Sequence, residues 1–129
     1  MGKFVVDAYS WVEYFNGTKS GEKVKGIVEN SSNLIYTNVI TIAELSSYFT
    51  RKGYDFETSK KIILSLSLFF PITKEFAEEA GKLHAKIKKE RKHIGLVDIL
   101  ILLTAIKLNA KVITGDEDFR DFKETLIIK

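Results

Sequence analysis

The sequence contains no cysteine, and it has only one proline and one methionine in 129 residues. The absence of cysteine excludes disulfide bonds, thiolate metal sites and a cysteine nucleophile, and it favours a reducing compartment such as the cytoplasm. Long hydrophobic runs are also absent, because the most apolar segment, residues 96–108, is interrupted by Asp98, Thr104 and Lys107 and is too short to cross a bilayer. The opening residues MGKFVVD lack the apolar region of a signal peptide. We therefore expect a cytoplasmic protein without a membrane anchor.

Length and charge set the broad class. A chain of this size fits one domain, residues 1–129, and roughly two thirds of its unfolded surface can be buried on folding. The formal net charge of +3 favours an anionic partner such as nucleic acid without identifying one.

Short β-prone runs alternate with helical patterns along the whole chain. Strands are expected at residues 4–6, 34–37, 69–72, 111–114 and 126–128, and helices at residues 9–15, 21–30, 39–52, 55–67, 74–91 and 96–108. Ser20 is a candidate cap for the second helix. This alternation predicts an α/β fold, a three-layer α/β/α sandwich with a central parallel sheet, in which the carboxyl ends of the strands share one edge. Ligand sites of such sheets lie at that edge.

Two predicted strands end in acids. Residues 4–6 lead into Asp7, and residues 111–114 lead through Gly115 into Asp116, Glu117 and Asp118. Both acidic positions should lie at the same edge. The simpler alternatives are a helix cap for Asp7 and a solvated turn for the three later acids.

Two further acids lie on predicted helices. Asp98 begins a helix that is apolar nearly all round, and no Lys or Arg lies one turn away; its alternative role is a first-turn acid bonded to backbone amides. Glu44 lies near the edge of the apolar face of its helix, and its alternative is a solvated side chain.

A cluster of these acids at one edge would be electrostatically unfavourable unless a cation binds them. Two carboxylates about 4 Å apart repel by roughly 4 kcal/mol at an effective dielectric constant of 20. Oxygen ligands without His or Cys select hard ions, so Mg²⁺ or Mn²⁺ is expected.

Four segments in order resemble the PIN-domain nucleases, most closely the VapC-type toxins of toxin-antitoxin pairs. They are VVD at 5–7, TIAEL at 41–45, VDILILLTA at 97–105 and VITGDEDF at 112–119. The resemblance implies a metal-dependent endoribonuclease that forms a homodimer and is inhibited by an antitoxin covering the active site. Asp7, Glu44, Asp98 and Asp116 correspond to the acidic quartet, Asp118 to an auxiliary metal ligand and Thr114 to a supporting residue. Ala8 departs from the Ser or Thr that often follows the first acid.

A basic run precedes Asp98. Its members Lys86, Lys88, Lys89, Arg91 and Lys92 are candidates to bind the RNA backbone, and their alternative role is a solvated helix end. His84 and His93 are expected to be structural or exposed. Tyr9, Trp11, Tyr14 and Phe15 are candidates for a stacking surface, a dimer contact or simple core packing.

Three alternative functions remain open on the sequence. One is an RNA-processing nuclease of the same fold without an antitoxin. Another is a receiver domain, although the sequence lacks its paired acids after the first strand and its phosphoacceptor after the third. The last is a non-catalytic binding module.

Overall fold

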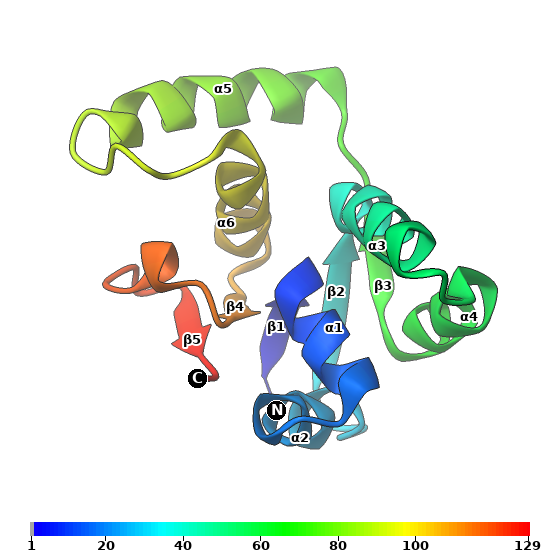
Figure 1. The fold of residues 1–129 in the computed structure, drawn as a ribbon. Coiled ribbons are helices and arrows are strands. Elements are labelled where there is room, and N and C mark those ends of the chain that lie inside the picture. The colour runs from blue at the N-terminus through cyan, green and yellow to red at the C-terminus, as the bar shows by residue number, and fades with distance from the viewer. Residues whose placement is uncertain (1) are drawn as a thin grey trace.

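The computed structural model describes residues 2–129, which form a parallel sheet covered by helices (Figure 1). The strands are β1 (Lys3–Val6), β2 (Leu34–Asn38), β3 (Leu68–Phe70), β4 (Lys111–Thr114) and β5 (Thr125–Ile127). The helices are α1 (Ala8–Asn16), α2 (Lys19–Val28), α3 (Val39–Lys52), α4 (Phe56–Leu66), α5 (Lys74–Lys88) and α6 (Leu96–Leu108), with a 3-10 turn η1 (Glu117–Phe119). No helix among residues 2–129 has the length and apolar character needed to cross a membrane.

The strand order within the described residues is β3-β2-β1-β4-β5, and every neighbouring pair is parallel. The carboxyl ends of the strands therefore share one edge, as the sequence predicts. The order also differs from the 2-1-3-4-5 order of receiver-like folds, so the receiver alternative is wrong.

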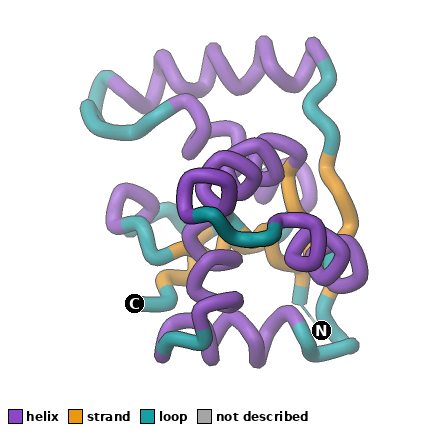
Figure 2. The backbone as a smooth tube through the Cα atoms, turned by 45° about the vertical axis from the view of Figure 1, so that its right-hand side comes forward, coloured by secondary structure: helices purple, strands orange, loops and turns teal. Residues whose placement is uncertain are grey.

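Two hydrophobic clusters lie on opposite faces of the sheet. Helices cover both faces, which confirms the three-layer prediction (Figures 1 and 2). Val5 and Val112 face the cluster formed with α5 and α6. The next residues along each strand, Val6 and Ile113, face the cluster formed with α1 to α4. This alternation follows from the twofold side-chain period of a strand.

Helix α6 is buried along most of its length because its sequence is apolar on every side. A hydrogen bond of 2.8 Å from Asn38 Nδ2 to Thr104 Oγ1 joins it to the end of β2. Asn38 Oδ1 also accepts the Ile40 N–H at 2.8 Å and caps α3. One side chain thus fixes the relative positions of the two helices that carry Asp98 and Glu44.

Several element boundaries differ from the sequence prediction for local reasons. Helix α2 is capped by Thr18 rather than Ser20, because the Thr18 hydroxyl accepts the Gly21 N–H at 3.0 Å. The third strand ends at Phe70, one residue before Pro71, which has no N–H to donate to a ladder. Helix α5 ends at Lys88 rather than at Arg91, and the last strand begins and ends one residue earlier than expected.

Gly21 marks the closest approach of α1 and α2. A methyl group at this position would overlap the backbone carbonyl of Glu13, whereas a methyl group at Gly26 in the same helix would meet no atom within 4 Å. We expect Gly21→Ala to lower the free energy of unfolding by about 1–3 kcal/mol through overpacking. The matched change Gly26→Ala should raise it by roughly 0.5–1 kcal/mol, since alanine favours the helix. Urea unfolding of both variants tests this; equal effects would contradict the close packing of the two helices.

Candidate active site

A cavity of about 450 Å³ lies at the carboxyl edge of the sheet, and its lining is rich in acids. Each acid of the predicted quartet lines it: Asp7 follows β1, Glu44 and Asp98 lie on α3 and α6, and Asp116 lies in the turn after β4. The remaining side chains of the wall include Tyr9, Ile101, Glu117, Phe119 and Lys129.

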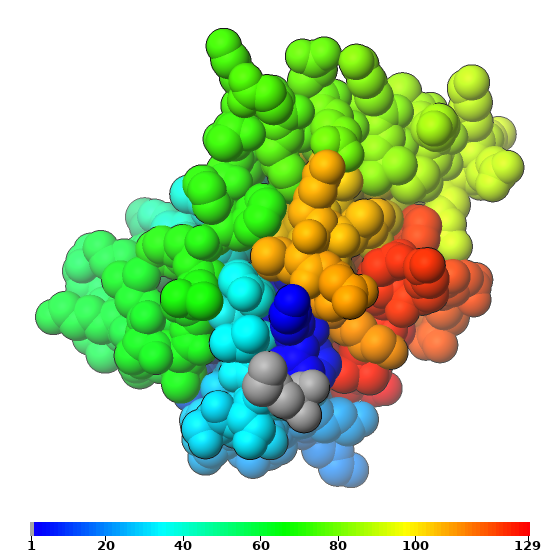
Figure 3. Space-filling view, turned by 180° about the vertical axis from the view of Figure 1, so that it is seen from behind, coloured from blue at the N-terminus to red at the C-terminus, as the bar shows by residue number. Residues whose placement is uncertain are grey.

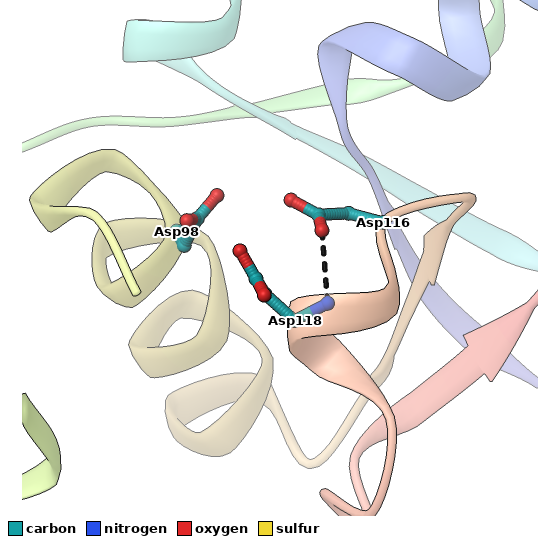
Figure 4. Close-up of side chains that lie close together, drawn as sticks. All are labelled: Asp98, Asp116 and Asp118. Atoms are coloured by element: carbon teal, nitrogen blue, oxygen red, sulfur yellow. Dashed lines mark hydrogen bonds between the residues drawn. The ribbon is translucent and has the colours of Figure 1, made fainter. Parts of the chain in front are cut away.

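Three carboxylates form a close group beside this cavity, and two of them, Asp98 and Asp116, line it. One oxygen from each of Asp98, Asp116 and Asp118 lies within 4.8 Å of the other two. Figure 4 shows Asp98 from α6 facing Asp116 and Asp118 from the turn after β4. Asp7 and Glu44 line the same cavity outside this close group.

The turn after β4 places Asp116 and Asp118 on the same side. Asp116 Oδ1 accepts the Asp118 N–H at 2.9 Å, while the Thr114 hydroxyl accepts the Asp116 N–H at 3.0 Å. Glu117 is not part of the close group; it accepts a bond of 2.9 Å from Arg120 Nη2, which helps to hold the pKa of Glu117 below its usual value. The three consecutive acids therefore have different roles: two enter the close group, and the middle one forms a surface ion pair.

Asp7 is buried at the end of β1 and also caps α1. Its Oδ1 accepts the Ser10 N–H at 2.8 Å, so the cap alternative describes part of its role. Burial raises the pKa of Asp7 to about 6; the hydroxyl of Thr114 and the amide and hydroxyl of Ser10 act in the opposite direction, and the charge of Asp116 adds to the rise. The Ser10 hydroxyl donates to Ile113 O at 2.8 Å and ties α1 to β4.

Asp98 and Glu44 are also held in an environment that disfavours charge. Burial raises the pKa of Asp98, and the nearby Asp116 and Asp118 add to this, although the Gly95 N–H donates to Asp98 Oδ2 at 3.0 Å and lowers it. The Glu44 side chain is more exposed than that of Asp98. Even so, desolvation of its carboxyl group and the charges of Asp7 and Asp98 raise the pKa of Glu44 to about 7. Burial and neighbouring negative charge thus raise the pKa values of Asp7, Glu44 and Asp98 together.

Tyr9 forms the wall beside the acidic turn. A methyl group added to Gly115 would overlap the Tyr9 ring, so a larger residue there would displace the ring from the acidic turn. Tyr9 also lines a second, more apolar groove of about 560 Å³ between α1 and α3, which continues from the acidic cavity past Ala8 and Glu44. The other predicted aromatic residues pack inward: Trp11 is fully buried, and Tyr14 and Phe15 pack against its cluster.

The sequence did not single out Lys129 or predict that Tyr9 would form the wall of the acidic cavity. Lys129 carries the only positive charge among the described residues that line the acidic cavity, and its Nζ lies 5.8 Å from the centre of the Tyr9 ring. It is far from the acidic motifs in sequence, and only the pairing of β5 with β4 brings it to this edge. No local sequence pattern signals that placement.

The predicted RNA-binding residues lie away from the cavity lining. Lys86, Lys88, Lys89 and Lys92 are exposed at the end of α5 and in the following segment. Arg91 instead turns toward η1 and donates to the carbonyl oxygens of Asp118 and Arg120.

The donor set fits a divalent cation that prefers oxygen ligands. Among residues 2–129, none of the five acids Asp7, Glu44, Asp98, Asp116 and Asp118 forms a salt bridge with Lys, Arg or His. Buried or clustered carboxylates without such partners destabilise the fold unless a cation offsets their charge. Carboxylates without nitrogen or sulfur ligands suit Mg²⁺ or Mn²⁺.

The fold and this cavity define an α/β protein with a carboxylate-lined site at the carboxyl edge of a parallel sheet. The PIN domain family model matches residues 4–124, and the chain belongs to that family. A search of curated protein sequences finds no significant match.

Solved structures with the same fold include VapBC proteins and a related toxin. A toxin-antitoxin complex from Klebsiella pneumoniae is 20% identical with a TM-score of 0.72, covering 97% of each chain. VapBC2 from Rickettsia felis, bound to a DNA fragment from its promoter, is 19% identical with a TM-score of 0.74, covering 97% of this chain and 96% of that one. VapC20 from Mycobacterium tuberculosis, a toxin that cleaves the sarcin-ricin loop, is 16% identical with a TM-score of 0.72, covering 94% and 97%.

Proposed function

We propose that this PIN domain is a divalent-metal-dependent endoribonuclease. The observation that carries the proposal is the group formed by Asp98, Asp116 and Asp118, in which one carboxylate oxygen from each residue lies within 4.8 Å of the other two. Asp98 and Asp116 line a cavity that Asp7 and Glu44 also line. Such a group fits one or two Mg²⁺ or Mn²⁺ ions, which bind phosphate oxygens as well as carboxylates. The ribonuclease toxin among the structures of the same fold supports RNA as the substrate.

Each acid has a separate place in the proposed site. Asp98, Asp116 and Asp118 would hold the ion directly, while Asp7 and Glu44 complete the acidic wall. When bound, the ion supplies Lewis-acid stabilisation of charge on the phosphoryl oxygens and lowers the pKa of water. The Thr114 hydroxyl holds the amide of Asp116 and so supports its orientation. Without the ion, Glu44 holds a proton on its carboxyl group in part of the molecules near pH 7, and ion binding would release it.

The positive side chains have a different task. Lys129 is placed to pair with a phosphate oxygen of the substrate at the rim of the cavity. The exposed Lys86, Lys88, Lys89 and Lys92 would attract the backbone of the RNA from further away, in a manner that salt screens.

We also propose an antitoxin as a protein partner, because solved structures of the same fold are toxin-antitoxin complexes. The apolar groove between α1 and α3 adjoins the acidic cavity, so a bound protein segment lying there would block access of RNA to the acids. A short reading frame beside the gene, whose product inhibits the purified protein, would separate a toxin from an RNA-processing nuclease. A homodimer is a further proposal, which light scattering of the purified protein tests.

End-group analysis of digested RNA tests the proposed reaction. Attack by water on the phosphodiester leaves a 5′-phosphate and a 3′-hydroxyl, and it does not use the 2′-hydroxyl of the RNA. We expect a substrate carrying a single 2′-deoxy nucleotide at the cleaved position to be cut as well. Products ending in a 2′,3′-cyclic phosphate would contradict the proposal, and a complete lack of cleavage with Mg²⁺ and Mn²⁺ across a broad set of RNAs would favour the non-catalytic alternative.

A further inference from the structure

Arg91 joins two segments that are far apart in the sequence. Its Nη1 donates to the carbonyl oxygen of Asp118 at 3.1 Å and to that of Arg120 at 2.9 Å. Its guanidinium also lies over the ring of Phe122, 4.1 Å from the ring centre. Figure 3 shows the yellow segment near residue 90 beside the red segment near residue 120. Both hydrogen bonds end on backbone atoms, so they fix the path of the chain around η1.

The segment that carries Arg91 also leads directly into Asp98. A bond of 3.1 Å between His84 Nε2 and the carbonyl of Ile94 ties this segment to α5, and Ile94 is buried. The next residue, Gly95, donates its N–H to the Asp98 carboxylate. The position of Asp98 is therefore linked through a short, anchored segment to Arg91, and through Arg91 to the turn that carries Asp116 and Asp118.

We propose that Arg91 is a positioning residue that holds the acidic turn at residues 116–118 against the start of α6, so that the three carboxylates stay within reach of one cation. The proposal rests on the proposed metal-dependent function. Three carboxylates so close together repel one another, and without a tie the turn moves outward. An arginine suits this task because its planar group can donate two hydrogen bonds and lie flat on an aromatic ring at the same time.

This role differs from that of an arginine that contacts RNA phosphates. A phosphate contact depends mainly on positive charge, which lysine retains. Loss of such a contact changes the salt dependence of RNA binding. A positioning role depends on the two hydrogen bonds from Nη1 together with the guanidinium over the Phe122 ring, and lysine has no planar group to place over that ring. Arg91→Lys therefore separates the two roles.

We expect Arg91→Lys to raise the Mg²⁺ concentration needed for half-maximal cleavage by about 10-fold or more, which is the usual effect of losing a group that orients metal ligands. The rate at saturating Mg²⁺ and the KM for RNA should stay close to those of the unchanged protein. Phe122→Leu, which removes only the ring under the guanidinium, should shift the Mg²⁺ requirement in the same direction by less. Lys89→Ala is the contrasting variant. It should lower the affinity for RNA and make that affinity less dependent on salt, while the Mg²⁺ concentration for half-maximal cleavage stays the same.

Thermal unfolding without RNA gives an independent readout. Mg²⁺ should raise the Tm of the wild-type protein. Arg91→Lys should have a similar Tm without Mg²⁺, but should need a higher Mg²⁺ concentration for the same increase in Tm. The positioning role is overturned if Arg91→Lys keeps the original Mg²⁺ titration and raises the KM for RNA, or if it only lowers the Tm equally with and without Mg²⁺. A Tm of the unchanged protein that does not respond to Mg²⁺ or Mn²⁺ would overturn the proposed function itself, and the positioning role with it.

Discussion

Asp98→Asn is expected to lower the rate of RNA cleavage at saturating Mg²⁺ by at least about 100-fold, since even partners of metal ligands contribute 10- to 100-fold. Asp98 is the acid of the close group that comes from α6, and its neutral replacement removes a charge that would hold the ion. Asparagine retains a side-chain oxygen that can accept the Gly95 N–H, so the start of the helix should remain intact. The measurement is the initial rate of cleavage of a labelled RNA.

Asp121→Asn is the matched control for this loss. Asp121 is an acid close to the same turn, it is exposed, and it does not line the cavity. Its backbone has a positive φ of 78°, a conformation that asparagine also tolerates. Activity close to that of the unchanged protein is expected, and an equal loss in both variants would show that overall charge matters rather than the metal group.

Asp7→Asn is expected to stabilise the metal-free protein while abolishing cleavage. The rise in the pKa of Asp7 from 3.8 to about 6 corresponds to about 3 kcal/mol of unfavourable burial when this group is ionised in the folded protein. Asparagine remains a good cap for α1, because its side-chain oxygen can still accept the Ser10 N–H. At pH 8 without metal, we therefore expect a higher free energy of unfolding for this variant, by up to about 3 kcal/mol.

The pH dependence of this difference follows from the direction of the pKa change. The folded protein binds the proton of Asp7 more tightly than the unfolded chain, so Asp7 lowers stability progressively as the pH rises from about 4 to about 6. The advantage of Asp7→Asn should be complete at pH 8 and absent near pH 4. Urea unfolding at both pH values measures it. An advantage that is the same at both pH values would mean that the variant acts by packing rather than by removing a buried charge.

Magnesium should reduce the difference in free energy of unfolding between Asp7→Asn and the wild-type protein at pH 8. A cation that binds the folded protein offsets the repulsion among the acids and stabilises the unchanged protein in proportion to its occupancy. Asp7→Asn has one negative charge fewer at the site, so Mg²⁺ should stabilise this variant less than it stabilises the wild-type protein. The acids would thus weaken the fold in exchange for a function, which is a common pattern at active sites.

The parallel sheet and most of the acidic edge could be predicted from strand ends. Asp7 and Asp116 each follow an apolar run, and in a parallel sheet such positions meet at one edge. Asp98 was recognisable because a charge in an otherwise apolar helix needs a partner. These predictions depend only on local pattern and on the handedness of crossover connections.

Other parts of the site depend on tertiary placement that local patterns do not encode. The direct entry of Asp118 into the close group depends on η1, a single turn whose geometry is set by the Asp116 carboxylate and the Thr114 hydroxyl. Arg91 lies in a basic run that resembles an RNA-binding segment, yet its guanidinium contacts the chain at residues 118–122. Lys129 reaches the cavity only because β5 pairs with β4 in the sheet. Each of these contacts joins residues that are distant in the sequence or oriented by a single turn.

The most direct test of a metal-dependent active site is the rate of RNA cleavage as a function of free Mg²⁺, measured from excess EDTA to saturating Mg²⁺ for the unchanged protein. The acidic group formed by Asp98, Asp116 and Asp118 predicts no cleavage in EDTA, a saturable rise with Mg²⁺ and full recovery when Mg²⁺ is restored after chelation. Cleavage at the full rate in EDTA would contradict the role assigned to these carboxylates.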